Sequence, residues 1–192
     1  MNDRRIFRQD HRNINKQGLS DVMATIVNGV DVDRLKALIQ TVKGDPSKGQ
    51  VEFETKTSWV EGAHSKTKIR DFSLEADEPR GLIGSDKAPN AVELVLASLG
   101  SCLSVGFAYN AAAMGINIRS MNIDVKGNLD LRGFLGISDS IRPGYQKITA
   151  TCRIDCDAPR EKLEELCKYV RRTSPVRDIL GNAEPLEILL KR

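Results

Sequence analysis

The sequence predicts an α+β fold with antiparallel sheets, and three observations carry that prediction. Apolar and polar residues alternate in several segments on both sides of residues 94–114, which is the spacing of half-buried strands. Residues 94–114 themselves, LVLASLGSCLSVGFAYNAAAM, form a long run without charge. The alternating segments follow one another as hairpins and meanders, with helical patterns set between groups of them rather than after every strand. Such an order favours α+β over the regular strand–helix winding of a parallel sheet.

The uncharged run 94–114 is predicted to be a buried core helix. A membrane span needs about 20 mostly apolar residues, so its length alone fits a bilayer. However, Ser98, Ser101, Ser104 and Asn110 dilute it, and the mean hydropathy of the chain is −0.33. We therefore expect no membrane association. A helix that is apolar all round must be covered on every side, and one small domain has little material for this. A second subunit is the natural cover, so we expect a homo-oligomer.

Composition excludes several function classes. A net charge of +3 and 5% aromatic residues give no basic patch or stacking platform, so no nucleic-acid partner is expected. The first residues lack the apolar core of a secretory signal, which predicts a cytoplasmic protein with reduced cysteines. No CxxC pair or Cys/His cluster occurs, so neither a metal site nor a cofactor is predicted. The length suits one domain, residues 49–192, preceded by a tail and helical extension, residues 1–48.

The extension is predicted to hold two short helices after a polar tail at 1–18. The first covers 22–27 and stops at Asn28-Gly29. Asp31 is the expected N-cap of the second, which should end near Gly44. The apolar face of this second helix follows helical spacing and consists of Leu35, Leu38, Ile39 and Val42. The segment GDPSKG then reads as a linker, with the domain boundary near Gly49.

From residue 50 the apolar period changes to two, which predicts a strand, a turn at 61–64 and a second strand. The first strand carries Val51, Phe53, Thr55, Thr57 and Trp59. In the second strand Ile69 lies on one phase and Phe72 and Leu74 on the other. That slip predicts a bulge near Arg70-Asp71.

A Gly- and Pro-rich loop leads to the central helix, for which Asn90 is the expected N-cap and Gly115 the stop. Two strands joined by a loop should follow, the first up to Leu131 and the second from Tyr145 to Cys156. The later elements are a helix capped by Asp157 with the apolar face Leu163, Leu166, Cys167 and Val170, a short helix at 176–180, and a closing strand carrying Leu186, Ile188 and Leu190.

Cys102, near the middle of the central helix, is the leading candidate for chemistry. A thiolate is the reactive form of cysteine and needs nearby positive charge or hydrogen-bond donors; Arg80 and Arg70 could supply the charge. Spacing alone, however, favours a small buried core residue. The other cysteines are predicted to pack: Cys152 and Cys156 lie roughly 13 Å apart on one strand, too far for a disulfide, and Cys167 lies on a helical stripe. His11 and His64 are expected to face solvent.

Several segments of the chain resemble those of a known protein family. The run APNAVELVLASLGSCLSVGFAYNAAAMGINI resembles the central helix of the OsmC/Ohr family, the osmotically inducible and organic hydroperoxide resistance proteins. TSWVEGAHS resembles the family's Trp-containing strand, and LDLRGFLGISDSIRPGYQKI resembles the linking segment of its OsmC-like branch. RTSPVRDIL resembles the start of the second conserved helix. The likeness covers about 49–192.

This resemblance implies a thiol peroxidase with the OsmC-like fold, an intertwined homodimer with its active sites at the interface. Cys102 falls on the peroxidatic cysteine, which attacks an organic hydroperoxide. Ser174 stands where the family has its resolving cysteine, so turnover requires an external thiol reductant. The catalytic glutamate falls at Val92, with Glu93 one residue later, and Arg80 lies in the loop that corresponds to the family's arginine. The alternative is a non-catalytic dimer of the same fold that binds an apolar small molecule, with Cys102 only packing.

Overall fold

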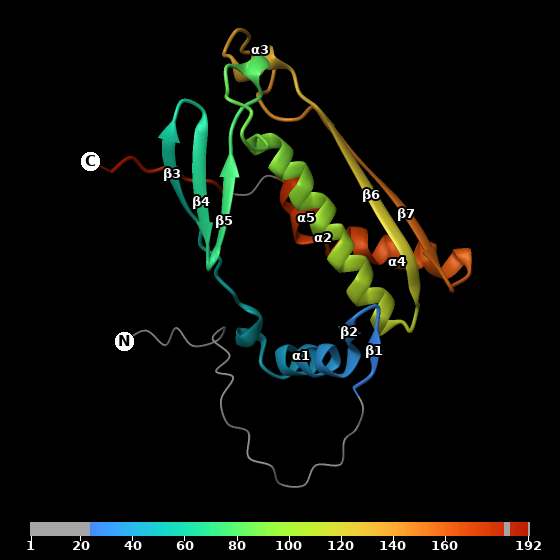
Figure 1. The fold of residues 1–192 in the computed structure, drawn as a ribbon. Helices are drawn as coiled ribbons and strands as arrows, with labels where there is room; N and C mark the ends of the chain where they lie inside the picture. The colour runs from blue at the N-terminus through green and yellow to red at the C-terminus, as the bar shows by residue number, and fades with distance from the viewer. Residues whose placement is uncertain (1–23, 183–184, 192) are drawn as a thin grey trace, which may run out of the picture.

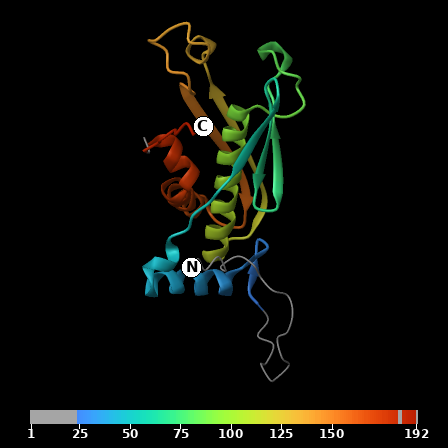
Figure 2. The same cartoon turned by 90° about the vertical axis from the view of Figure 1, so that its left-hand side faces the viewer.

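The computed structural model describes residues 24–182 and 185–191, and the long helix α2 (Ala91–Ala113) runs through its middle. Figure 1 shows a three-stranded sheet on one side of α2, made of β3 (Lys56–Glu61), β4 (His64–Ile69) and β5 (Phe72–Ala76). The hairpin of β6 (Ile118–Asn128) and β7 (Lys147–Cys156) lies on the other side. Figure 2, turned by 90°, shows that α4 (Arg160–Thr173) and α5 (Pro175–Gly181) cover a further side of α2. Antiparallel sheets therefore surround a long central helix, which confirms the predicted α+β class.

Both ends of α2 are set by local sequence signals. The Asn90 side chain accepts a hydrogen bond from the Glu93 backbone N–H (2.8 Å), and the Glu93 carboxylate accepts one from the Asn90 N–H (2.9 Å). This reciprocal capping box satisfies backbone donors that a helix start leaves free. At the other end Gly115 adopts φ +69°, a left-handed conformation that favours glycine. The predicted cap and stop are both confirmed.

One face of α2 forms the core of the molecule. It packs on α4 (Arg160–Thr173) and on β6–β7. The buried side chains that it contributes are Leu99, Leu103, Phe107 and Ala111. On the opposite face Val105 and Tyr109 remain 52% and 48% exposed. The predicted burial on every side is therefore not reached within one chain. By length and composition, α2 is the one helix in the described part that could cross a bilayer.

The hairpin of β6 (Ile118–Asn128) and β7 (Lys147–Cys156) forms the predicted two strands after the central helix. Its inward residues alternate, as expected for a sheet with one packed face; they include Met121, Ile123, Val125, Cys152 and Ile154. The first strand ends earlier than predicted, at Asn128, because Leu131 begins a short helix, α3 (Leu131–Phe134), within the connecting loop.

The second sheet contains β3 (Lys56–Glu61), β4 (His64–Ile69) and β5 (Phe72–Ala76). The predicted strand began too early, since residues 50–55 form no strand. The predicted bulge was wrong: Arg70 and Asp71 form a two-residue turn with Arg70 at φ +54°, and this turn produces the slip in phase. Among the described elements, these strands pack closely only with one another.

The predicted helix over 22–27 was wrong within the described residues. Ile26–Val27 (β1) and Val30–Asp31 (β2) form a small hairpin, with Asn28 and Gly29 at φ +53° and +74°. Two residues with positive φ are what a tight hairpin turn requires, and Asn-Gly is its preferred sequence. Val22, Met23 and the tail 1–18 lie outside the described residues.

The second predicted helix of the extension is confirmed as α1 (Val32–Gly44), with Asp31 accepting from the Arg34 N–H (2.9 Å). A short 3₁₀ turn, η1 (Pro46–Gly49), follows it. The Asn28 side chain joins this extension to the core, since it donates to the Ile116 carbonyl (2.9 Å) and accepts from the Ile118 N–H (2.8 Å). The domain boundary at Gly49 stays a prediction.

Two predictions near the C-terminus need correction. Asp157 does not cap α4, because its carboxylate accepts from the backbone and side chain of Asn117 (2.8 and 2.6 Å); Pro159 occupies the cap position instead. The short helix is confirmed as α5 (Pro175–Gly181). The predicted closing strand is absent from residues 185–191, where Leu186 and Ile188 are 85% and 88% exposed and pair with no other strand.

Candidate active site

Cys102 lies at the edge of the packed face of α2, where the C-terminal end of α4 approaches. The approach is close because Gly106, one turn later, has no side chain: a Cβ there would lie 3.0 Å from Val170 Cγ1. This close packing brings the junction between α4 and α5 against Cys102. The thiol is half-buried as a result.

The Ser174 hydroxyl is the hydrogen-bond partner of Cys102, with Oγ 3.2 Å from Sγ. Ser174 is buried at the junction and caps α5, where its Oγ accepts from the Arg177 N–H (3.3 Å). Because Oγ already accepts one hydrogen bond, its proton is free to point at the sulfur. A hydroxyl in this position orients the thiol and can donate to a thiolate or to its oxidised product.

The other side of Cys102 is open and apolar. Val105 and Tyr109 follow Cys102 at i+3 and i+7, so they share its face of the helix. Both are about half-exposed. A molecule that reaches the sulfur from this side therefore meets an aliphatic and an aromatic side chain, which suits an organic group better than a hydrated one.

Glu93 and Arg80, the other predicted catalytic residues, do not contact Cys102 within the described chain. The Glu93 carboxylate is held in the capping box, and on a continuous helix nine positions separate it from Cys102 by roughly 13 Å along the axis. Arg80 lies exposed in the 3₁₀ turn η2 (Arg80–Leu82), and its side chain has no ion pair among the described residues. Their catalytic roles stay predictions.

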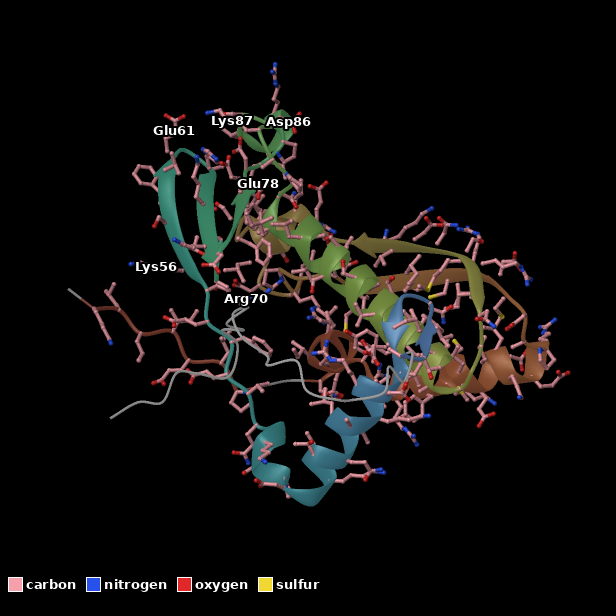
Figure 3. The ribbon with its side chains drawn as sticks, turned by 60° about the horizontal axis from the view of Figure 1, so that its bottom comes forward. Lys56, Glu61, Arg70, Glu78, Asp86 and Lys87 are labelled. Carbon is pink, nitrogen blue, oxygen red and sulfur yellow. The ribbon has the colours of Figure 1, made fainter. Side chains whose placement is uncertain are left out.

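Arg70, the second arginine considered, lies at the β4–β5 turn with its guanidinium over the Phe72 ring (5.2 Å). Figure 3 shows Arg70 at one end of the β3–β5 sheet, and Glu61 and Lys87 at the other. His64, expected in solvent, is buried, and its Nε2 lies 3.0 Å from a Glu75 carboxylate oxygen. His11 lies outside the described residues. The sequence placed His64 in a turn and did not indicate that Glu75 of β5 would be its partner.

The loop between β5 and α2 is built around the buried carboxylate of Asp77. It accepts hydrogen bonds from three backbone N–H groups, those of Glu78 (2.8 Å), Ser85 (3.1 Å) and Lys87 (3.1 Å). Gly84 is required here, since a Cβ would lie 1.7 Å from the Glu78 carbonyl oxygen. An ion pair from Lys87 to Glu61 (3.0 Å) ties the loop to β3. The loop therefore holds the N-terminus of α2 and Arg80 in place.

We expect Asp77→Asn to loosen this loop. The backbone hydrogen bond from Lys87, followed by those from Glu78 and Ser85, lowers the pKa of Asp77. A carboxyl with a lowered folded-state pKa stabilises the fold above its unfolded pKa, about 3.9, and loses that contribution as the pH falls through the folded value. The melting temperature of the wild type, followed by circular dichroism, should therefore decrease when the pH is lowered below about 4. Asp77→Asn should melt lower at pH 7, and an unchanged melt would contradict this anchor.

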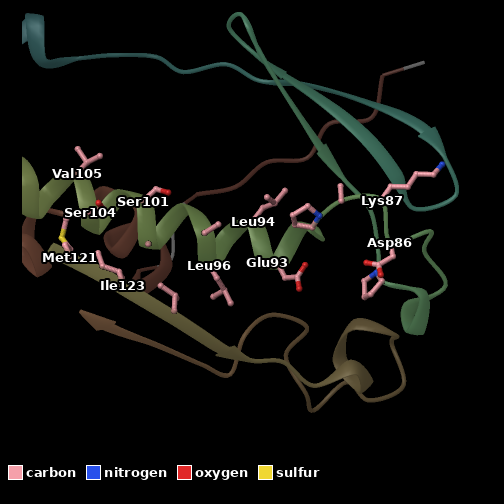
Figure 4. Close-up of a pocket in the computed structure, with 16 residues that line it drawn as sticks. Asp86, Lys87, Glu93, Leu94, Leu96, Ser101, Ser104, Val105, Met121 and Ile123 are labelled. Atoms are coloured by element: carbon pink, nitrogen blue, oxygen red, sulfur yellow. The ribbon is translucent and has the colours of Figure 1, made fainter. Parts of the chain in front are cut away.

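A groove of about 1150 Å³ follows the N-terminal half of α2 on the side of β6. Figure 4 shows Met121 and Ile123 of β6 facing α2, with Asp86 and Lys87 at the loop end. The apolar part of its wall includes Leu94, Leu96, Val105, Met121, Ile123 and Val125. Cys102 does not line the groove, although its neighbour Ser101 does. The groove and the thiol therefore lie on adjacent faces of one helix.

The other cysteines belong to the core, as predicted. Cys152 and Cys167 pack against the buried cluster from β7 and α4. Burial, with Cys167 as its neighbour, raises the pKa of the Cys152 thiol, which disfavours its reactive form. All four cysteines are free thiols. Within residues 24–182 and 185–191, no group of three His, Cys, Asp or Glu side chains could hold a metal ion.

We expect Cys167→Ala to leave any reaction of Cys102 intact, because Cys167 contributes packing rather than chemistry. The variant should consume hydroperoxide at the wild-type rate, measured by peroxide disappearance with a thiol reductant. Loss of turnover, together with a disulfide between Cys102 and Cys167 in the oxidised wild type, would contradict the packing role.

Fold and site together define an α+β protein built around a cysteine-bearing central helix. The chain belongs to the OsmC-like protein family, whose family model matches residues 84–188. This confirms the resemblance seen in the central motif. No curated protein matches the chain.

Several solved structures share the fold at low sequence identity. An OsmC-like protein from Mycoplasma pneumoniae superposes with a TM-score of 0.61 at 16% identity, covering 69% of this chain and 89% of that one. An OsmC-like protein of unknown function from Vibrio cholerae gives 0.57 at 11% identity, covering 67% and 93%. An organic hydroperoxide resistance protein OsmC from Legionella pneumophila gives 0.52 at 16% identity, covering 68% and 91%. At such identities the likeness shows the fold alone.

Proposed function

We propose that this protein is a thiol-dependent peroxidase that reduces organic hydroperoxides through Cys102 and is regenerated by an external thiol. The observation that carries the proposal is the contact between Cys102 Sγ and the buried Ser174 hydroxyl. It gives the thiol a hydroxyl partner on one side, which can donate to a thiolate, and an open apolar approach on the other. Membership of the OsmC-like family and the structural likeness to an organic hydroperoxide resistance protein support the same reaction class.

The proposed reaction has an oxidation step and a regeneration step. The Cys102 thiolate attacks the outer oxygen of ROOH; an S–O bond forms, the O–O bond breaks, and the departing alkoxide takes a proton to give ROH. The sulfur is oxidised to a sulfenic acid. An external thiol then attacks this sulfur, releasing water and leaving a mixed disulfide. A second external thiol attacks the external sulfur of the mixed disulfide. Cys102 is released as a thiol, and the two external thiols leave as a disulfide.

A single-turnover experiment tests this proposal. The reduced protein is mixed with one equivalent of cumene hydroperoxide without reductant, trapped with dimedone and digested for mass spectrometry. We expect one equivalent of peroxide to disappear and the dimedone adduct to be on Cys102. Cys102→Ser should consume none, and Cys156→Ser is the matched control for removing a thiol. Equal consumption by Cys102→Ser would reject the proposal.

We further propose that the protein works as an intertwined homodimer in the cytoplasm. Within the described residues, the apolar face of the β3–β5 sheet has no cover: Trp59 is 74% and Phe72 64% exposed. The half-exposed face of α2 beside Cys102 is uncovered as well. A second copy that covers both surfaces would remove this apolar area from water, which favours association.

Trp59, the only tryptophan of the chain, reports on this dimer directly. We expect sedimentation to give twice the chain mass and Trp59 emission to shift to the blue as the protein concentration rises through dissociation. A monomer at all concentrations, with emission typical of a solvated indole, would overturn the dimer.

The groove favours a second candidate function, the binding of an apolar small molecule by an OsmC-fold dimer. Its aliphatic wall suits such a ligand, and Cys102 lies outside it. On this reading, Cys102→Ser would bind an apolar probe such as 1-anilinonaphthalene-8-sulfonate as well as the wild type does, and neither protein would consume hydroperoxide. The single-turnover experiment therefore separates the two functions.

A further inference from the structure

Four basic side chains surround one hollow at the corner between α4 and α5. The hollow has a volume of about 330 Å³ and is lined by Lys168, Arg171, Arg172 and Arg177. Three of them belong to the last two turns of α4, where cations complement the helix dipole. The fourth, Arg177, comes from α5, so two helices contribute charge to the same hollow.

No acidic side chain lines the hollow, and none of the ion pairs within the described part of the chain involves its four basic residues. Because the whole chain carries a net charge of only +3, four cations at one corner are a local concentration of positive charge. Such a concentration attracts anions within a Debye length, about 10 Å at 0.1 M salt.

One of the arginines is held by a contact of its own. The Arg172 guanidinium lies over the Tyr169 ring at 5.2 Å from its centre. This contact leaves the charge of Arg172 unpaired and reduces the freedom that its side chain would lose on binding. Planar guanidinium groups match the oxygens of carboxylate, sulfonate and phosphate groups.

The basic hollow lies close in sequence to Ser174, the residue whose hydroxyl contacts the Cys102 thiol. Ser174, which contacts Cys102, stands two residues after Arg172 and three before Arg177. The Cα atoms of these arginines are therefore at most about 8 and 11 Å from that of Ser174. Cys102 does not line the hollow, so an anion bound there leaves the sulfur accessible. The cations of α4 are exposed, whereas Val170 of the same helix packs on Gly106 of α2. The hollow therefore opens on the outer side of the α4–α5 corner, and the sulfur lies on its inner side.

We infer that this corner binds the acidic group of an anionic small-molecule thiol, and that this thiol is the reductant of oxidised Cys102. The role of the thiol as reductant rests on the proposed function, whereas the binding of an anion does not. A negatively charged thiol would be concentrated beside the sulfenic acid by the four cations, and its sulfur would form the mixed disulfide with Cys102 and release water. Ser174 supplies no thiol for this step, so the thiol must come from solution. Positive charge near the site would raise the local concentration of an anionic thiol.

Three thiols of different charge test the inference. Peroxide turnover of the full chain is measured with 2-mercaptoethanesulfonate (anionic), 2-mercaptoethanol (neutral) and cysteamine (cationic) at low ionic strength. We expect the anionic thiol to react about tenfold faster than the neutral one after correction for thiolate fraction, with the advantage falling as salt is added. Lys168→Gln/Arg171→Gln should remove the advantage and leave the neutral thiol unchanged. Lys36→Gln/Lys43→Gln, on exposed positions of α1, is the control with the same change in net charge.

A binding titration keeps this test separate from the proposed function. Ethanesulfonate, which carries no thiol, is titrated into the wild type and both double variants and followed by calorimetry. Binding that only Lys168→Gln/Arg171→Gln loses supports the anion site even if no thiol sustains turnover; in that case the reductant role is overturned. Equal rates for all three thiols and no ethanesulfonate binding would overturn the inference while leaving the peroxidase proposal standing.

Discussion

Ser174→Cys is expected to convert the site into one that closes an internal disulfide with Cys102. The atom at this position already lies 3.2 Å from Cys102 Sγ, and a disulfide needs about 2.05 Å, so a shift of roughly 1 Å suffices. After reaction with hydroperoxide, the new thiol would attack the sulfenic acid, form the S–S bond and release water. Mass spectrometry of the oxidised variant should find the cross-link between positions 102 and 174 without added thiol.

The same variant should change which reductant the protein needs. A wild-type protein oxidised in the presence of a monothiol carries a mixed disulfide, whereas Ser174→Cys should carry the internal one and should depend more strongly on a dithiol reductant. Ser174→Ala is the matched control, since it removes the hydroxyl and adds no thiol. Failure of Ser174→Cys to cross-link, with dimedone still labelling Cys102, would mean that the contact at the α4–α5 corner does not persist in solution.

Local signals in the sequence predicted the central helix and its ends, because capping is decided by residues only a few positions apart. Asn90 and Glu93, three positions apart, form the capping box with each other. The errors occurred where a local pattern met a competing local signal or a long-range contact. Apolar spacing over 22–27 indicated a helix, but Asn28-Gly29 adopts the positive φ angles of a hairpin turn. Asp157 had the right type for an N-cap, but Asn117, 40 positions away, takes its carboxylate.

The site depended on long-range packing, which spacing does not encode. Cys102 and Ser174 are 72 positions apart. Only the resemblance to the family placed Ser174 at the position of a partner for the cysteine, and the structure brings the two together. The hollow between α4 and α5 was missed because Arg171-Arg172 alone is typical of a solvated helix face. Arg177 of α5 completes the lining of the hollow. It reaches the basic residues of α4 because the chain turns tightly at Ser174, between the two helices.

Phe107→Ala is expected to cause the largest loss of stability of any single truncation on α2. Phe107 is 1% exposed and belongs to the same buried cluster as Leu166 and Val170 of α4. Removing a buried phenylalanine side chain leaves a cavity and should lower the free energy of unfolding by about 3–5 kcal/mol. Urea unfolding at fixed protein concentration, followed by circular dichroism, measures this loss.

Leu38→Ala on α1 is the informative control for that experiment. Leu38 belongs to the apolar face of an amphipathic helix, yet it is 59% exposed in one chain. A truncation at so exposed a position should change the free energy of unfolding by only about 0.5 kcal/mol. If Leu38→Ala instead costs as much as Phe107→Ala, the face of α1 must be covered in solution, and the extension then belongs to the dimer interface. A small loss leaves α1 outside it, attached to the core through Asn28.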